Sequence, residues 1–160
     1  MDYVGLPLRE SLGILVDTLH SYELRDRIRI VASGKLITPA FVGLALATGA
    51  DVVVSARGFM FALGCIQAMQ CHKNTCPTGV TTHDPKLQHG LDPANKANRV
   101  ANYHHQVVHE VGIIAHSCGV SEPAKLRREH VGIVMEDGRS KALQDCLQGE
   151  PVKIIGASPQ

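Results

Sequence analysis

The chain has 160 residues, enough for one ordinary domain with a sizeable core. Hydrophobic residues make up 44% and charged residues 19%, which excludes a disordered tail. The formal net charge of +1 offers no basic field for nucleic acid or an anionic membrane surface, so neither is an expected partner. The sequence starts without a basic region followed by an apolar run, so no secretory signal is predicted and a cytoplasmic protein is expected.

The first 35 residues predict a helix followed by a strand. Between positions 8 and 24, apolar side chains recur at spacings of three and four, which is typical of an amphipathic helix; they are Leu8, Leu12, Leu15, Leu19 and Tyr22. A β-branched run over 28–31 then predicts a short buried strand. The strand is expected to end at the loop Ser33-Gly34-Lys35.

A second helix and a second strand follow. Thr38 before Pro39 predicts a helix start, with Thr38 as the N-cap, and Gly49 predicts the helix end. Val52-Val53-Val54 is a second predicted buried strand. It ends at a second loop of small residues, Ser55-Ala56-Arg57-Gly58.

The order of these elements predicts the fold class. A third helix, from about 59 to 69 and carrying Cys65, is expected after the second loop, so strand, loop and helix alternate twice. This order is typical of an α/β parallel sheet with crossover helices, and the short repeat suits a β/α barrel. A complete barrel needs eight strands and roughly 250 residues. Because only two strands are predicted here, we expect this chain to form the C-terminal portion of such a barrel.

The rest of the chain predicts a mainly helical extension. Asp92-Pro93 opens a helix that is expected to run to about residue 116, and its apolar face is Val100, Tyr103, Val107, Val111 and Ile114. After Arg128, the remainder of the chain, with Asp137-Gly138 and Gly149, predicts a loose hairpin or tail. We therefore divide the chain into two parts. Residues 1–83 form the end of the barrel and include the loop with the cysteines, and residues 84–160 form a helical extension with a tail.

The loops at the two strand ends predict a phosphate site. Parallel α/β folds bind ligands at the C-terminal ends of strands, where small residues let backbone N–H groups approach phosphate oxygens and helix starts add positive charge. The candidate cradle is Ser33, Gly34, Lys35, Ala56, Arg57 and Gly58. Alternatively, the two glycines only permit tight turns and Arg57 is a solvated surface charge.

Three of the five cysteines lie within twelve residues, at Cys65, Cys71 and Cys76. They can be incidental, with Cys65 a small buried hydrophobe, or they can bind zinc with His72 or His83 as a fourth ligand. An iron–sulfur cluster fits the spacing better, because clusters are held by thiolates close in sequence and Pro77 directly follows the last one. A three-iron cluster and a four-iron cluster with one open corner both remain compatible with three thiolates.

The segments around these cysteines resemble the FMN-binding glutamate synthase family, whose members share the FMN-binding domain of glutamate synthase. The resemblance covers most of the chain, from about residue 4 to 139. It is carried by Leu63-Gly64-Cys65, the run from Cys71 to Gly79, and Thr81-Thr82-His83-Asp84-Pro85. The stretches 32–35 and 45–56 also resemble the last two strand–loop units of that family's barrel.

The resemblance implies a (β/α)8 TIM-type barrel that carries FMN, with a [3Fe–4S] cluster beside the flavin. By position, the implied cluster ligands are Cys65, Cys71 and Cys76. The implied flavin-phosphate region is Gly34, Lys35 and the loop from Ser55 to Gly58. One departure is Ser33, which stands where the large synthases usually have an acidic residue.

The implied activity is the formation of glutamate by reductive amination of 2-oxoglutarate with ammonia, free or derived from glutamine. The cluster would relay electrons to FMN, so an electron-donor protein or subunit is an implied partner. No Gly-x-Gly-x-x-Gly motif for a pyridine nucleotide occurs in the sequence. Because the family's earlier barrel strands are missing, the chain alone is expected to complete no turnover. The competing hypotheses are a non-catalytic metal-binding or electron-transfer module, and a truncated inactive product.

Overall fold

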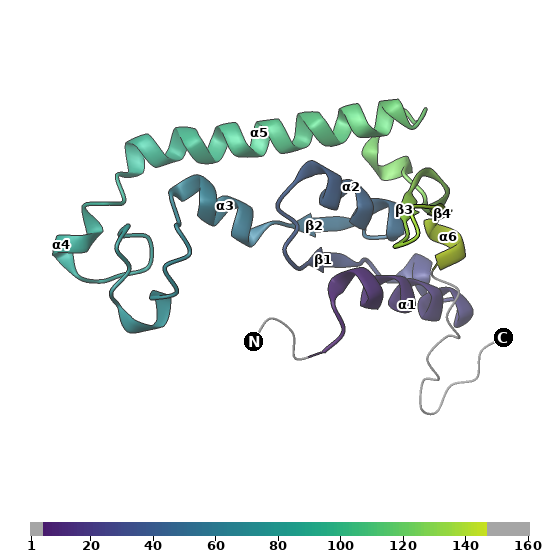
Figure 1. Cartoon of the computed structure of the whole chain (residues 1–160), viewed down its shortest axis with the longest axis horizontal. Coiled ribbons are helices and arrows are strands. Elements are labelled where there is room, and N and C mark those ends of the chain that lie inside the picture. The colour runs from purple at the N-terminus through teal and green to yellow at the C-terminus, as the bar shows by residue number, and fades with distance from the viewer. Residues whose placement is uncertain (1–4, 147–160) are drawn as a thin grey trace.

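The computed structural model describes residues 5–146, which combine helices with two small sheets (Figure 1). The helices and strands are α1 (Leu8–Ser21), β1 (Val31–Ser33), α2 (Pro39–Thr48), β2 (Val52–Val54), α3 (Ala56–Leu63), α4 (Pro85–Gln88), α5 (Pro93–Ser117), β3 (Gly132–Val134), β4 (Ser140–Ala142) and α6 (Leu143–Cys146). Short 3-10 turns occur at Arg25–Arg27, Cys71–Lys73, Pro123–Lys125 and Arg128–His130. The chain is thus of the α/β class, as predicted.

The first sheet consists of β1 and β2, which pair in parallel through the crossover helix α2, as the sequence predicts. However, β1 covers Val31–Ser33 and not the predicted 28–31. The register joins Val31 to Val52, Ala32 to Val53 and Ser33 to Val54. The prediction that both strands are buried is wrong, because one face of this sheet is uncovered within the described chain. On that face Val31 is 59% exposed, Val52 50% and Val54 44%. On the other face Ala32 is 1% exposed.

The main core lies between this covered sheet face and the helices α1, α2 and α5. Its buried residues are Leu12, Val16, Leu19, Ile30, Ala32, Leu36, Val42, Ala45, Ala50 and Val111. Leu12, Val16 and Leu19 share one face of α1, as helical spacing requires, whereas Leu15 is 46% exposed although the same pattern predicts it inside. Figure 1 shows the long helix α5 running over both α2 and α3, so it joins the sheet unit to the segment beyond α3.

The start and end of α2 follow the predicted signals. The Thr38 side chain accepts a hydrogen bond from the Phe41 backbone N–H, and Pro39 occupies the first helical position. Gly49 ends the helix with φ of 125°, a conformation that disfavours any other residue. A Cβ at Gly49 would also lie 2.9 Å from Val16. Helix end and core packing therefore both require glycine here.

The predicted third helix is displaced toward the N-terminus. It covers Ala56–Leu63 and not 59–69, because Ser55 already takes the N-cap position and Gly64 ends the helix with φ of 104°. Gln67 and Met69, which lie inside the predicted range, also have positive φ values of 56°, which a right-handed helix excludes. Cys65 consequently follows α3 and is not carried on it.

The C-terminal segment returns to the α1–α2 unit. Arg128 forms an ion pair with Asp17 at 2.7 Å and donates to the carbonyl oxygens of Gly13 and Thr48, each at 3.4 Å. The predicted hairpin is formed by the antiparallel strands β3 and β4. The remainder of the predicted tail, residues 147–160, lies outside the described residues. None of the helices in the described part of the chain combines the length and apolarity needed to cross a bilayer.

Asp51 ties the segment before β1 to the start of β2. Its carboxylate accepts hydrogen bonds from the Ile30 backbone N–H at 2.7 Å, from Arg25 at 2.9 Å and from Arg29 at 3.2 Å. Partial burial by itself would raise the pKa of Asp51, but the hydrogen bonds from Ile30, Arg25 and Arg29 outweigh burial and lower it. The carboxylate is thus a stabilising anion at neutral pH.

We expect Asp51→Asn to lower the free energy of unfolding at pH 7 by about 1–3 kcal/mol, because Arg25 and Ile30 lose a charged acceptor. The folded pKa lies below the unfolded value of 3.8, so this stabilisation is present above pH 3.8 and is lost as pH falls through the folded pKa. Urea unfolding at pH 7 and in acid measures it. The difference from wild type should shrink in acid, and exposed Asp137→Asn should change stability by less than about 0.5 kcal/mol; a pH-independent difference would contradict the assignment.

Candidate functional site

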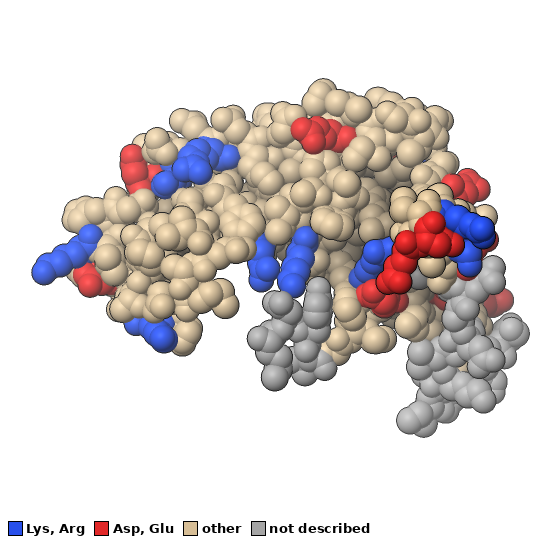
Figure 2. Space-filling model, in the orientation of Figure 1, with Lys and Arg blue, Asp and Glu red and all other residues tan. Residues whose placement is uncertain are grey.

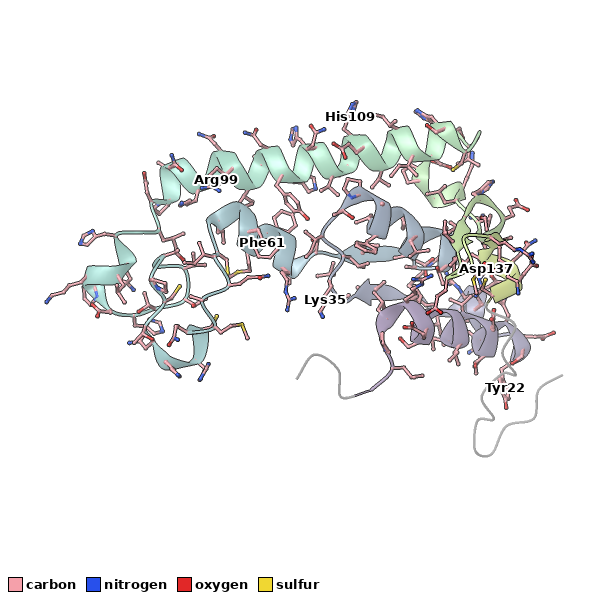
Figure 3. The ribbon with its side chains drawn as sticks, viewed as in Figure 1. Tyr22, Lys35, Phe61, Arg99, His109 and Asp137 are labelled. Carbon is pink, nitrogen blue, oxygen red and sulfur yellow. The ribbon has the colours of Figure 1, made fainter. Side chains whose placement is uncertain are left out.

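A cavity of about 890 Å3 lies beside the C-terminal end of β1. The segment after β1, the N-terminal turns of α1, and part of α2 line it, and so does Arg57 from the first turn of α3. Lys35 and Arg57, the two predicted cations, both line this one cavity. Figure 2 shows two basic side chains next to each other on the lower face of the molecule, and Figure 3 places Lys35 there.

The predicted phosphate cradle is partly assembled by the fold. Of the residues predicted to bind the phosphate, Ser33, Gly34, Lys35 and Arg57 line the cavity, whereas Ser55, Ala56 and Gly58 do not. The predicted second loop is in fact helical from Ala56 onward, because α3 starts there with Ser55 at its N-cap position. The predicted cradle residues that line the cavity therefore come from the last residue of β1, the loop after it and the first turn of α3.

Gly58 has a packing role that the sequence does not reveal. It is buried where α5 crosses α3, and a Cβ at this position would overlap the Tyr103 hydroxyl and lie 2.6 Å from Ser55 Oγ. The interpretation that Gly58 permits a tight turn is wrong, because its place is inside the helix and its missing side chain makes room for a tyrosine of another helix.

Tyr103 joins the two halves of the cradle, and sequence reasoning placed it only on the apolar face of α5. Its hydroxyl donates to the Ile37 carbonyl oxygen at 2.7 Å and is hydrogen-bonded to Ser55 Oγ at 2.9 Å. Its ring packs edge-on against Phe59, with centroids 5.0 Å apart. The helical spacing signals the packing face, but nothing in the sequence signals the hydroxyl's two partners.

The start of α3 is electropositive and uncapped. Ser55 occupies the N-cap position, yet neither it nor another side chain of the described residues caps α3. The first turn contains Arg57 and no acidic residue. Free N–H groups, the helix dipole and two nearby cations together suit a bound anion such as a phosphate group.

The cysteine loop forms a separate lobe beyond the end of α3, between α3 and α4 (Figure 1). Cys65, Cys71 and Cys76 line one common small cavity, together with the apolar residues Met60, Ile66, Ala68, Met69 and Val80. The cavity measures about 10 Å3, room for about one water molecule. Within residues 5–146, no three His, Cys, Asp or Glu side chains are close enough together to hold a single metal ion.

Hydrogen bonds favour the ionised form of one of these cysteines. Cys76 is buried, with its sulfur 3.4 Å from the Thr78 hydroxyl. The hydrogen bond with the Thr78 side chain, followed by that from the Thr81 backbone, lowers the pKa of Cys76 from 9.0 to about 6. Thr81 Oγ1 is also buried at this cavity and, among residues 5–146, has no partner within hydrogen-bonding geometry. At neutral pH the loop therefore presents a thiolate, the form of cysteine that binds metals.

The polar residues between and after the cysteines hold the loop in shape. Asn74 has a left-handed φ of 62°, its carbonyl oxygen accepts from the buried Thr82 hydroxyl at 2.7 Å, and its side chain accepts from the His83 backbone N–H at 2.6 Å. Gly79 has φ of 76° and packs against the backbone near Leu87. His72 and His83 do not line the cysteine cavity.

The end of the loop leads into α4, a short helix that the sequence analysis does not predict. Asp84 occupies its N-cap and accepts from the Lys86 backbone N–H at 2.9 Å, and Pro85 takes the first helical position. The same Asp-Pro signal, at Asp92-Pro93, correctly predicts the start of α5. The Asp84-Pro85 pair is therefore also a helix-start signal, but the helix that it opens has only four residues.

Comparisons with known proteins agree with the motifs in this region. The family model described as "Conserved region in glutamate synthase" matches residues 1–121. The chain is 47% identical over 86% of its length to the glutamate synthase large subunit-like protein YerD of Bacillus subtilis, covering 26% of that protein. It is 35% identical over 79% of its length to the archaeal glutamate synthase [NADPH] of Methanocaldococcus jannaschii, covering 25% of it.

A third relative extends the match to nearly the whole chain. The archaeal-type glutamate synthase [NADPH] of Thermotoga neapolitana is 30% identical over 99% of this chain, which covers 29% of that protein. The chain thus spans between a quarter and a third of the length of these relatives. The family match covers both the cradle and the cysteine loop, and the chain belongs to the glutamate synthase family.

Proposed function

We propose that this chain is part of a flavin and iron–sulfur oxidoreductase that forms glutamate from 2-oxoglutarate and ammonia by reductive amination. The observation that carries the proposal is the position of α3. The basic cavity lies at its first turn, and the three-cysteine loop begins directly after its end. Eight helical residues span about 12 Å. Two redox groups held at these places would be neighbours in one protein.

The uncovered face of the β1–β2 sheet supports the proposal that this sheet is part of a larger barrel. Val31, Val52 and Val54 project from this face and are roughly half exposed, although parallel strands are normally covered on both faces. Within the part of the chain that the structure describes, this two-stranded sheet also leaves both its edges unpaired. The proposal is that residues 1–83 are the C-terminal end of a TIM-type β/α barrel whose other strands complete the sheet, and that 84–160 are its helical extension.

The residues at the cavity fit the phosphate of FMN. Lys35 and Arg57 would neutralise its charge, and the free N–H groups of α3 would bind its oxygens. Gly34 keeps the loop close to α1, since a Cβ there would lie 3.1 Å from the Leu8 Cβ. FMN, when bound, supplies the electrons that reduce the imine formed from 2-oxoglutarate and ammonia. The role of this chain's residues is to bind and orient the phosphate end, and no catalytic residue is assigned.

The cysteine loop fits a [3Fe–4S] cluster that relays electrons to the flavin. Cys65, Cys71 and Cys76 face one cavity, and Cys76 is ionised at neutral pH. A zinc site is less well supported, because His72 and His83 lie outside this cavity. The cavity is smaller than a cluster, so the loop must rearrange to hold one.

The partners follow from this chemistry. Ammonia, free or released from glutamine, and 2-oxoglutarate are the proposed substrates, and an electron-donor protein or subunit is needed to reduce the cluster. Thiolate ligands and a reductive reaction suit the reducing cytoplasm. The alternative is a non-catalytic metal-binding or electron-transfer module that uses the same loop.

Anaerobic expression with iron and sulfide, followed by metal and sulfide analysis, tests the proposal. We expect broad visible absorption and about three irons per chain, and saturable quenching of FMN fluorescence on titration. Electron paramagnetic resonance of the oxidised protein separates a three-iron from a four-iron cluster. A colourless protein without iron would refute the cluster, and bound zinc without a redox response would establish the alternative.

A further inference from the structure

Ser55 occupies the N-cap position of α3, but its side chain does not cap the helix. Serine is among the residues that most favour the N-cap of a helix, where its hydroxyl accepts a hydrogen bond from the second or third backbone N–H. Ser55 is the N-cap residue of α3, yet it makes no such bond. Its Oγ lies instead 2.9 Å from the hydroxyl of Tyr103, a residue on a different helix.

Several contacts hold the Tyr103 hydroxyl in its position beside Ser55. The tyrosine hydroxyl donates its hydrogen to the Ile37 carbonyl oxygen at 2.7 Å, so in its contact with Ser55 it accepts the serine hydrogen. Gly58 leaves the space that the hydroxyl occupies, and Phe59 packs edge-on against the ring. The Tyr103 hydroxyl is thus fixed from three sides.

Two elements of the cavity wall meet at this one hydroxyl. Ile37 lines the cavity from the segment after β1, while Ser55 immediately precedes the helix turn that contributes Arg57. Tyr103 itself is not among the residues that line the cavity. Any effect of Tyr103 on a ligand in the cavity therefore has to pass through the residues that it contacts, among which Ser55 and Ile37 are its hydrogen-bond partners.

We infer that Tyr103 is a positioning residue that withholds Ser55 from its capping role, so that the first N–H groups of α3 stay free for the flavin phosphate. The inference rests on the proposed function. In Tyr103→Phe, the ring and its packing remain, but Ser55 is released and becomes free to cap α3. The cap then competes with the phosphate for the same N–H groups.

The test compares FMN and inorganic phosphate affinities of four proteins: wild type, Tyr103→Phe, Ser55→Ala, and the double variant. We expect Tyr103→Phe to weaken binding about 3- to 30-fold, the size of a typical capping interaction. The double variant should recover most of this loss, because it has no serine left to compete. A role in packing alone predicts no recovery, so a double variant as weak as Tyr103→Phe would overturn the inference.

A second measurement keeps the inference separate from the proposed function. Backbone hydrogen exchange at Arg57 and Gly58 should slow about 3- to 30-fold in Tyr103→Phe without any ligand, since a cap now protects one of these amides. Unchanged exchange would overturn the inference. If wild type binds neither FMN nor phosphate, the proposed phosphate site fails, while the exchange result still decides whether Tyr103 withholds the cap.

Tyr22→Phe is the matched control. Tyr22 lies at the far end of α1, well away from Lys35 (Figure 3). Removing its hydroxyl should change neither the FMN affinity nor the exchange at Arg57 and Gly58. Equal effects of the two tyrosine substitutions would show that a general loss of stability, and not the cap, is responsible, and would overturn the inference.

Discussion

Replacing Cys76 with serine should abolish the iron–sulfur cluster. Serine has a similar size, but its hydroxyl is not ionised at neutral pH and cannot replace the thiolate as an iron ligand. We expect the iron content to fall from about three to less than about one per chain, with loss of the visible absorption. Cys71→Ser should behave in the same way, because both sulfurs face the same cavity as Cys65.

Cys146→Ser provides the control for this experiment. Cys146 is exposed in α6 and does not line the cysteine cavity. Its replacement should leave the iron content unchanged, so that the loss is specific to the loop. Circular dichroism distinguishes a folded protein without a cluster from an unfolded one. Full iron content in both Cys71→Ser and Cys76→Ser would refute the assignment of these ligands.

In the metal-free chain, the lowered pKa of Cys76 predicts that thiolate absorption depends on pH. Thiolate absorption near 240 nm should rise by one thiolate as pH increases through about 6, because the thiol is protonated below that value and ionised above it. Cys76→Ser should lack this step. If the step persists in the variant, another cysteine is responsible for it.

Replacing Gly58 with alanine should destabilise the fold by about 2–4 kcal/mol. The added Cβ would overlap the Tyr103 hydroxyl, so α5 or the tyrosine must move and lose its bonds to Ile37 and Ser55. Overpacking costs about 1–3 kcal/mol and each lost hydrogen bond about 1 kcal/mol, whereas alanine recovers only about 1 kcal/mol of helix propensity. Urea unfolding monitored by circular dichroism measures the net change.

Gly112→Ala isolates the effect of the Tyr103 contact. Gly112 lies inside α5, and a Cβ there would meet nothing within 4 Å. This substitution should therefore stabilise the protein by about 0.5–1 kcal/mol through helix propensity alone. The two glycine-to-alanine changes should have opposite signs. If both substitutions stabilised the protein, Tyr103 would have moved away from the added Cβ without any loss in the free energy of unfolding.

Local signals predicted much of the backbone. Thr38-Pro39 and Asp92-Pro93 each open a helix at the expected residue, and Gly49 ends α2 as predicted. The parallel pairing of β1 with β2 is also confirmed. These signals work because caps, proline and glycine act through the chain's own backbone within a few residues. The three cysteines were likewise recognisable from sequence, and the fold brings them to one cavity.

Features that depend on distant residues were not predictable in this way. The burial expected for Val31, Val52 and Val54 requires further sheet and helix layers, which two strands do not provide. The close contact at Gly58 and the hydrogen bond of Ser55 both involve Tyr103, which lies about 50 residues further along the chain. The assignment of FMN and [3Fe–4S] ligands came from the family resemblance and stays a prediction for the individual residues.

The short helix α3 also limits how this region can change. The cavity with Arg57 lies at its first turn, and the cysteine loop begins at its left-handed terminal residue, Gly64. Inserting or deleting one residue within α3 would rotate one end relative to the other by about 100° and shift it by about 1.5 Å. Substitutions within α3 can therefore be tolerated far better than changes in its length, which would turn the cysteine loop away from the cavity.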